Sequence, residues 1–367
     1  MSRAADFEAA SRSIALLCHA DLPPDGFRSE ILREIAKVIS VDAVWWAAAD
    51  PATLLFTSAY QAGLPTDSAS YFIDNEFLVQ DVNRWTDLGR DRRGVRSLAE
   101  ATAGRLRASP RYRDIFAPLG LGDELRTVLR IQGQTWGLLC LHRAAGSNYT
   151  SEQADWLRKI APDLATALRV AVLHEAASAG GERAPGIVML GPDGSITSAS
   201  RTGAEWLDEL AAGRSGVRPI PVAVQAVAAR LRSLGTDGHL PPRLRLRTPA
   251  GRWAVLHASW IDGPDQAVIA VIIEEAAPTE VAPVIMLAYG LTPQERKITG
   301  LISRGLSTSE VAEELSIVSD TVQDHLKSVF AKTGTGSRAE LVATLMRQQY
   351  LPRVKARARV GPAGFFA

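Results

Sequence analysis

Three helix-start signals of the same form lie close together near the carboxyl end of the chain. In each, a hydroxyl residue is followed three positions later by a glutamate. The pairs are Thr292–Glu295, Ser307–Glu310 and Ser337–Glu340. In such a capping box the hydroxyl accepts a hydrogen bond from the third helical N–H, and the glutamate accepts one from the N-cap N–H. This segment is therefore restricted to a series of short helices with closely defined starts.

Apolar residues at helical spacing follow each start, and a further amphipathic stretch ends at Gly334. The apolar positions are Ile298, Leu301, Ile302, Val311, Ala312, Leu315, Val322, Leu326, Val329, Phe330, Leu341, Val342 and Leu345. Helices this short are marginal alone, so the predicted four must pack on one another. A short helix, a turn of about three residues and a longer helix make a helix-turn-helix.

The longer helix has a polar face opposite its apolar stripe, formed by Gln323, Asp324 and Lys327. Glutamine can pair with adenine, aspartate can accept from the cytosine amino group, and lysine can reach guanine or a phosphate. Three polar residues on an amphipathic helix are also what an ordinary solvated face presents. The residues alone leave both interpretations open.

Charge is informative only locally. The whole chain has 41 basic and 40 acidic side chains, a net charge of +1, which favours no partner. Between Leu291 and Val360 there are eleven basic residues and seven acidic ones. A local basic excess suits a module that contacts phosphates.

The stretch LTPQERKITGLISRGLSTSEVAEEL…TVQDHLKSVFAKTG…SRAELVA resembles the LuxR-type DNA-binding domain. The resemblance implies an all-α tetrahelical domain over residues 284–352 that dimerises, partly through its fourth helix, on an inverted repeat in duplex DNA. It assigns base contacts to Gln323, Asp324 and Lys327. It assigns phosphate contacts to Thr321, His325, Lys332 and Arg338.

One position departs from the family pattern. Three residues before the Thr-Val pair, where the family has a capping serine, this chain has Val318. We expect Ser319 or Asp320 to cap the helix one position later, and Ser319 is therefore included in the predicted DNA-binding set. Residues 353–367 form a basic tail that we expect to be flexible.

The first block, residues 1–178, mixes helices and strands. A helix is predicted over 27–39 and another from Thr150, where Thr150 and Gln153 form a capping box. Strands are predicted over 41–48, 124–131 and 135–142, the last two joined by a Gln132-Gly133 turn. An irregular crossover is expected over 66–122. The order of elements and the TWGLLCLHR…YTSEQADWL stretch resemble an α+β GAF domain.

The middle block, residues 186–276, begins with a strand pair around an Asp193-Gly194 turn. A short helix with Trp206 follows, and then a helix over 221–234. The remaining predicted strands are 243–247, 253–261 and 267–274. This order resembles an α+β PAS domain. Gly/Pro-bearing, small-residue stretches at 176–186 and 276–283 are predicted linkers, so the chain is expected to be multidomain.

Five residues of the first block are candidates for a ligand pocket: Trp46, Arg126, Trp136, Cys140 and His142. Strand alternation puts Trp136, Cys140 and His142 on one face. Pockets are mostly apolar with few polar groups, and an arginine suits an anionic ligand. The alternatives are ordinary core packing, and for Arg126 a surface salt bridge.

Several functional classes lack their sequence signals. Cys18 and Cys140 have no metal-ligand spacing, and the six histidines are scattered. No Gly-rich phosphate loop, nucleophile–base set or phosphoreceiver pattern is recognisable. We therefore expect no enzymatic activity, no metal and no cofactor. Without a signal peptide or a long apolar run, a cytoplasmic protein is expected.

The sequence thus predicts a homodimeric, DNA-binding transcriptional regulator of bacterial type, whose upstream domains sense a small-molecule effector and which contacts RNA polymerase. Three alternatives are weighed against it. In the first, the upstream domains bind nothing small and serve as dimerisation scaffolds. The others are an enzyme localised by its terminal module and an interaction module similar to sigma-factor region four. Which effector and which DNA sequence are involved does not follow from the residues.

Overall fold

The computed structural model describes residues 3–20, 24–65, 68–173, 183–211, 220–235, 242–261 and 267–345. The chain packs as two compact units. The first comprises Met1–Arg169, Pro185–Leu246 and Leu256–Ile273, and the second Val170–Ala184, Arg247–Val255 and Glu274–Ala367. Most of the predicted linker at 176–186 and the basic tail lie outside the described residues. Within the described ranges no helix is long and apolar enough to cross a membrane.

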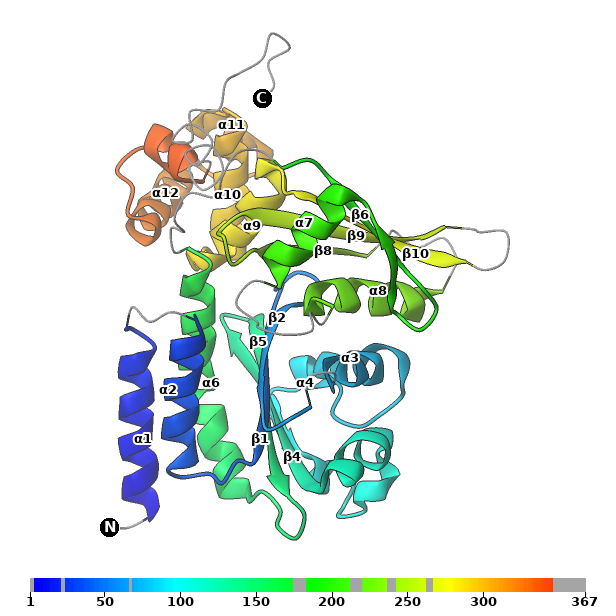
Figure 1. The fold of residues 1–367 in the computed structure, drawn as a ribbon. Helices are drawn as coiled ribbons and strands as arrows, with labels where there is room; N and C mark the ends of the chain where they lie inside the picture. Colours follow the sequence, from blue (N-terminus) through cyan, green and yellow to red (C-terminus); the bar gives the residue numbers. More distant parts are fainter. Residues whose placement is uncertain are drawn as a thin grey trace. The chain divides into compact units, whose positions relative to one another are not determined.

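The first block is built on a five-stranded antiparallel sheet with the order β2-β1-β5-β4-β3 (Figure 1). Its strands are β1 (Ala43–Ala49), β2 (Phe56–Ala62), β3 (Val95–Ser97), β4 (Leu121–Ile131) and β5 (Gln134–Ala144). One face packs against α1 (Arg3–Leu17), α2 (Pro24–Ala36) and α6 (Ser151–Ala171). The core of this domain therefore has two layers, one on each side of the sheet.

Two local predictions in this block are confirmed. Gln132 and Gly133 join β4 to β5 with φ of 51° and 76°, the two positive values that a type I′ hairpin turn requires. At the start of α6, the Thr150 N–H donates to Gln153 Oε1 at 3.1 Å, and the Gln153 N–H donates to Thr150 Oγ1 at 3.2 Å. These contacts form the capping box.

The crossover at 66–122 is more regular than predicted. It contains α3 (Ser68–Leu78), α4 (Trp85–Arg90), β3 and α5 (Leu98–Ala101), followed by the short turns η1 (Leu106–Ala108), η2 (Tyr112–Phe116) and η3 (Ala117–Leu119). Most of these elements are too short for a sustained periodic pattern, and α3 buries the polar residues Ser68, Asn75 and Glu76, which obscures its apolar stripe. They cover the second face of the sheet.

The middle block contains the second five-stranded sheet, with the order β7-β6-β10-β9-β8. Its elements are β6 (Gly186–Leu190), β7 (Ile196–Ala199), α7 (Arg201–Leu210), α8 (Val222–Leu234), β8 (Arg243–Arg247), β9 (Trp253–Ile261) and β10 (Val268–Glu275). Strands β6 and β7 pair antiparallel around the predicted turn, where Gly194 has φ of 80°. The predicted element order of this block is confirmed.

The predicted linker at 276–283 is wrong, because most of it belongs to α9 (Pro278–Ala288). Pro278 stands in the first turn, where a missing N–H does no harm and the fixed φ suits a helix. Glu280 accepts the Ala277 N–H at 2.9 Å, and Val281 and Ile285 are buried. The small-residue composition thus marked a helix start and not a flexible connection.

The terminal block forms α10 (Pro293–Ser303), α11 (Thr308–Glu314), α12 (Ser319–Thr333) and a helical segment over 338–345. Thr292 and Glu295 exchange the predicted pair of hydrogen bonds, as do Ser307 and Glu310. At the third start, Ser337 Oγ accepts the Glu340 N–H at 3.1 Å, whereas Glu340 accepts the N–H of Gly336. The helix starts are confirmed, with this last box shifted by one residue.

Candidate nucleic-acid interface and buried charge network

Helix α12 has one face inside the domain and one in solvent. Val322 and Leu326 are buried in a core shared with α10 and α11. Gln323, Asp324 and Lys327 are exposed on the opposite face. The predicted base-reading residues therefore share one accessible surface on a helix that the core holds in place.

Asp324 and Lys327 form an ion pair on this surface, with Nζ 2.9 Å from Oδ1. Their side chains are 74% and 75% exposed. An ion pair this exposed is screened by water and salt and contributes little to stability. Either residue can therefore exchange its partner for another at little cost in free energy: Asp324 for a hydrogen-bond donor, and Lys327 for an acceptor or an anion.

The start of α12 differs from the prediction. Val318 is the N-cap residue, is 67% exposed, and provides no side-chain cap. The expectation that Ser319 or Asp320 would cap the helix is wrong, because the helix already begins at Ser319. An aliphatic side chain has no acceptor for the free N–H groups of the first turn. Ser319 itself is exposed within that turn.

Lys332, predicted to contact phosphate, forms an ion pair with Glu295 of α10. Its Nζ lies 2.8 Å and 2.7 Å from the two carboxylate oxygens. Glu295 also accepts the Ser328 hydroxyl at 2.7 Å and the Thr292 N–H at 2.7 Å, and is only 3% exposed. Burial raises the pKa of Glu295, but these hydrogen bonds, first that of Lys332, lower it to about 2. Lys332 thus helps to hold α12 on α10.

The remaining predicted contacts flank the exposed face. Thr321 and His325 are half-buried along α12. Arg338, at the start of the last helical segment, donates to the Leu306 carbonyl at 3.4 Å and to the Thr308 hydroxyl. Arg338 is therefore placed by α11, the first helix of the helix-turn-helix.

The basic excess of this block has a definite location. From Leu291 to Leu345 six residues are basic and seven acidic. The other five of the eleven basic residues follow Leu345, outside the described part of the chain. The described helices of this block therefore have no net positive charge.

In the first block, the predicted ligand residues divide between the two faces of the sheet. Cys140 pairs with Arg126 across β4 and β5, and His142 follows two residues later on the same strand. Trp136 precedes them on β5 and is also buried. Trp46 packs on the opposite face, its ring 5.9 Å from that of Phe27. The structure therefore brings Arg126, Cys140 and His142 together and separates Trp46 from them.

Arg126 belongs to a buried charge network, so the surface salt bridge considered for it is wrong. Its Nε donates to Glu124 Oε1 at 2.9 Å and its Nη1 to Glu76 Oε2 at 3.0 Å. Arg111 approaches the other oxygen of Glu124 at 2.8 Å and reaches Asp81 at 3.2 Å. All five side chains are at most 3% exposed. The sequence analysis missed Arg111, since it lies in the crossover with no recognisable motif.

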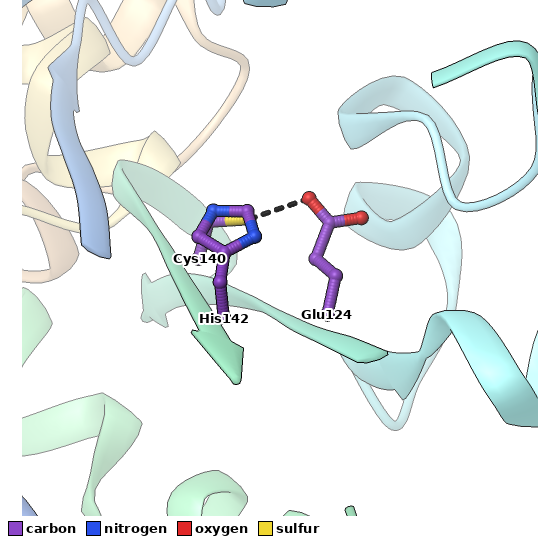
Figure 2. A group of neighbouring side chains, drawn as sticks. All are labelled: Glu124, Cys140 and His142. Carbon is purple, nitrogen blue, oxygen red and sulfur yellow. Dashed lines mark hydrogen bonds between the residues drawn. The ribbon is translucent and has the colours of Figure 1, made fainter. Parts of the chain in front are cut away.

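Cys140 and His142 adjoin this network (Figure 2). The Cys140 thiol donates to Glu124 Oε1, with Sγ and Oε1 2.6 Å apart. Both ring nitrogens of His142 lack a hydrogen-bond partner among the described residues. An unsatisfied buried polar group costs roughly 1–3 kcal/mol. Burial is the main cause that lowers the pKa of His142, to about 4. The imidazole is therefore neutral near pH 7.

The packing of α10, α11 and α12 defines a helix-turn-helix domain, the class of protein module that places a helix in the major groove. Residues 290–345 match the family model described as bacterial regulatory proteins, luxR family. This terminal domain is therefore a LuxR-type helix-turn-helix, as the resemblance predicted.

Two curated transcriptional regulators match short segments of the chain. A putative HTH-type transcriptional regulator of Mycobacterium bovis is 45% identical over 58 residues, 16% of this chain and 7% of that protein. The monoamine regulon transcriptional regulator of Klebsiella aerogenes is 43% identical over 53 residues, 14% of this chain and 23% of that protein. The match thus spans less than a quarter of either relative.

Among solved structures, Escherichia coli SdiA aligns with 94% of this chain and 99% of its own, at 12% identity and a TM-score of 0.34.

Proposed function

We propose that the protein is a DNA-binding transcriptional regulator whose helix α12 reads bases in the major groove. The observation that supports this is the exposed face of Gln323, Asp324 and Lys327 on a helix fixed by a buried core, inside a domain that matches the luxR family. Side chains at the start of a recognition helix reach base edges, and these three lie in its first nine residues.

The upstream blocks complete the proposal. The GAF-like block (1–178) and the PAS-like block (186–276) sense an effector or mediate dimerisation, and so modulate promoter binding in the cytoplasm. A homodimer places two copies of α12 on the half-sites of an inverted repeat, since two-fold protein symmetry is mirrored by operator symmetry. Contact with RNA polymerase follows from regulation at a promoter.

Selection of binding sites from random duplex DNA tests the base-reading face. We expect the full chain to select an inverted repeat, and Gln323→Ala and Asp324→Ala to relax the preference at particular positions. A good side-chain–base pair discriminates by about 1–3 kcal/mol. Lys297→Ala is the control, because Lys297 is exposed on α10 of the same domain. Preferences that stay unchanged in the α12 variants would refute the assigned face.

One observation favours the alternative in which the upstream domains bind no small molecule. The sheet face expected to hold a ligand is occupied by the protein's own side chains, since the Trp45 ring lies 4.9 Å from Phe56 and 6.0 Å from Phe72. On this account the first block is a scaffold for dimerisation. Native mass spectrometry and an absorption spectrum of the purified full chain separate the two: a bound organic molecule favours the sensor, and a bare dimer the scaffold.

A further inference from the structure

Three side chains with metal-ligand chemistry converge on one face of the N-terminal sheet. Cys140 and His142 alternate along β5, and Glu124 of β4 is the direct cross-strand partner of His142. Figure 2 shows the carboxylate of Glu124 directed toward the thiol and the imidazole. A sulfur, a nitrogen and an oxygen of these residues lie within 4.8 Å of one another. Two paired strands thus bring together donors that are sixteen residues apart in sequence.

The donor types select one class of ion. Thiolate, imidazole and carboxylate are together the ligands that Zn²⁺ takes in proteins. Ca²⁺ and Mg²⁺ prefer oxygen ligands only, so a set with sulfur and nitrogen disfavours both. The cluster therefore suits a divalent transition-metal ion of intermediate softness.

His142 gives independent evidence for a metal site. Its side chain is fully buried and contacts the rings of Phe72 and Phe116, with centroid separations of 5.8 Å and 4.8 Å. Neither ring nitrogen has a hydrogen-bond partner within the described ranges. A neutral imidazole has one lone pair able to accept a proton or a metal ion, and buried polar atoms are nearly always paired. A metal ion beside Cys140 would use that lone pair.

The charges of the surrounding network also favour a cation. The side chains joined by ion pairs are two arginines, Arg111 and Arg126, and three carboxylates, Glu76, Asp81 and Glu124. With a neutral thiol, the buried group therefore has one negative charge in excess. A divalent ion adds two positive charges, and ionisation of Cys140 adds one negative charge. The metal-bound cluster, with the two guanidinium groups included, is then neutral.

From these observations we infer that Glu124, Cys140 and His142 form a three-ligand site for a divalent transition-metal ion such as Zn²⁺. The ion replaces the thiol proton that now lies between Cys140 Sγ and Glu124 Oε1, and this proton is released to solvent. Zinc–ligand lengths of about 2.3 Å to sulfur and 2.0–2.1 Å to nitrogen place those two atoms about 3.6 Å apart in a tetrahedron. Donor atoms now up to 4.8 Å apart therefore draw together by roughly 1 Å, whereas Cys140 Sγ and Glu124 Oε1, now 2.6 Å apart, separate by about the same distance. The fourth position stays open to a non-protein ligand.

Cobalt titration of the tag-free full chain tests the site, because a Co²⁺–thiolate bond gives a strong near-ultraviolet absorption. After removal of metals with a chelator, we expect this absorption to saturate at one equivalent of Co²⁺ and to disappear when Zn²⁺ displaces it. The chain has two cysteines, so Cys18→Ala is a matched control for Cys140→Ser. The absorption should persist in Cys18→Ala and be lost in Cys140→Ser.

A second variant separates a metal ligand from a core histidine. His142→Phe keeps an aromatic ring beside Phe72 and Phe116 and removes both nitrogens. Loss of an outer-shell partner alone weakens metal binding by about 10–100-fold, so loss of this ligand should weaken it by at least that factor. Zn²⁺ should raise the Tm of the wild type and leave that of His142→Phe unchanged.

Two results would overturn the inference: no Co²⁺–thiolate absorption in the wild type, or an absorption that disappears in Cys18→Ala. If Cys140→Ser does not fold, Cys18→Ala still decides, because a thiolate signal without Cys18 can come only from Cys140. The titration contains no DNA. Its outcome is therefore independent of the proposed function.

Discussion

Two groups of oppositely charged side chains in this molecule differ in their exposure to water. Asp324 and Lys327 on α12 are about three-quarters exposed. Arg111, Glu124 and Arg126, beside the N-terminal sheet, are at most 1% exposed. The geometry of the contacts is similar, with nitrogen–oxygen distances of 2.8–2.9 Å in both places. The two groups differ, however, in how much free energy their ion pairs contribute.

The difference shows which charges are available for binding. An exposed ion pair is weak and screened, so its members can be redirected to another partner. A buried pair has lost its hydration, and removal of one member leaves an uncompensated charge. We therefore interpret the α12 face as a binding surface, and the sheet network as a fixed structural element beside the proposed metal ligands Cys140 and His142.

The largest effect is expected where a buried charge loses its partner. Arg111→Met leaves Glu124 and Asp81 each without one of their ion-pair contacts, and should lower the free energy of unfolding by about 3–5 kcal/mol. Urea denaturation of the full chain measures it. Arg113→Met, a change at an exposed neighbour, should stay within about 0.5 kcal/mol. Equal effects of the two substitutions would show that the network does not stabilise the fold.

A smaller effect is expected at the ion pair between the partly exposed Lys332 and the buried Glu295. The folded-state pKa of Glu295, about 2, is below its ordinary value of 4.5. Stability from this carboxylate is therefore fully present above pH 4.5 and is lost as the pH falls toward 2. The difference between these two pKa values corresponds to roughly 3–4 kcal/mol before solvent screening reduces it.

The difference in unfolding free energy between wild type and Glu295→Gln, measured by denaturation from pH 7 downward, should shrink over that interval. Glu340→Gln is a suitable control, because Glu340 is exposed and also near a helix start. A difference that stays constant between pH 4.5 and 2 would contradict the assigned role of Glu295.

The smallest effect on stability is expected at the start of α12. Val318→Ser supplies an acceptor for the first-turn N–H groups and should stabilise the protein by about 0.5–1 kcal/mol. Val318→Ala is the matched control, since alanine and valine are equally poor caps. Thermal unfolding of the three proteins compares them. An unchanged Tm in Val318→Ser would mean that another group already satisfies this helix end.

The sequence revealed the structure best where local chemistry decides it. The capping boxes at Thr292 and Ser307 and the Gln132-Gly133 turn each act within a few residues, and each is present. The helix α9 was missed because Pro278 and its small neighbours read as a connection. The crossover helices were missed because α4 and α5 are too short to show a period and α3 buries polar residues such as Asn75 and Glu76.

The residues of the candidate sites likewise divide into those that local spacing predicts and those that only the tertiary structure brings together. Helical spacing alone places Gln323, Asp324 and Lys327 on one face. Strand alternation puts Cys140 and His142 together, but it cannot tell which residue of another strand stands opposite. The pairing of Glu124 with His142, and the approach of Arg111 from the crossover, depend on tertiary register. The commitment of Lys332 to Glu295, 37 residues away, was hidden for the same reason.

The account's central claim is that the exposed face of α12 reads bases, whereas Lys332 holds the helix in place. The most direct test is binding-site selection from random duplexes by wild type, Lys327→Ala and Lys332→Ala in parallel. We predict that Lys327→Ala changes the base preference at particular positions, and that Lys332→Ala leaves every preference unchanged. A position-specific change in Lys332→Ala, with none in Lys327→Ala, would contradict the claim.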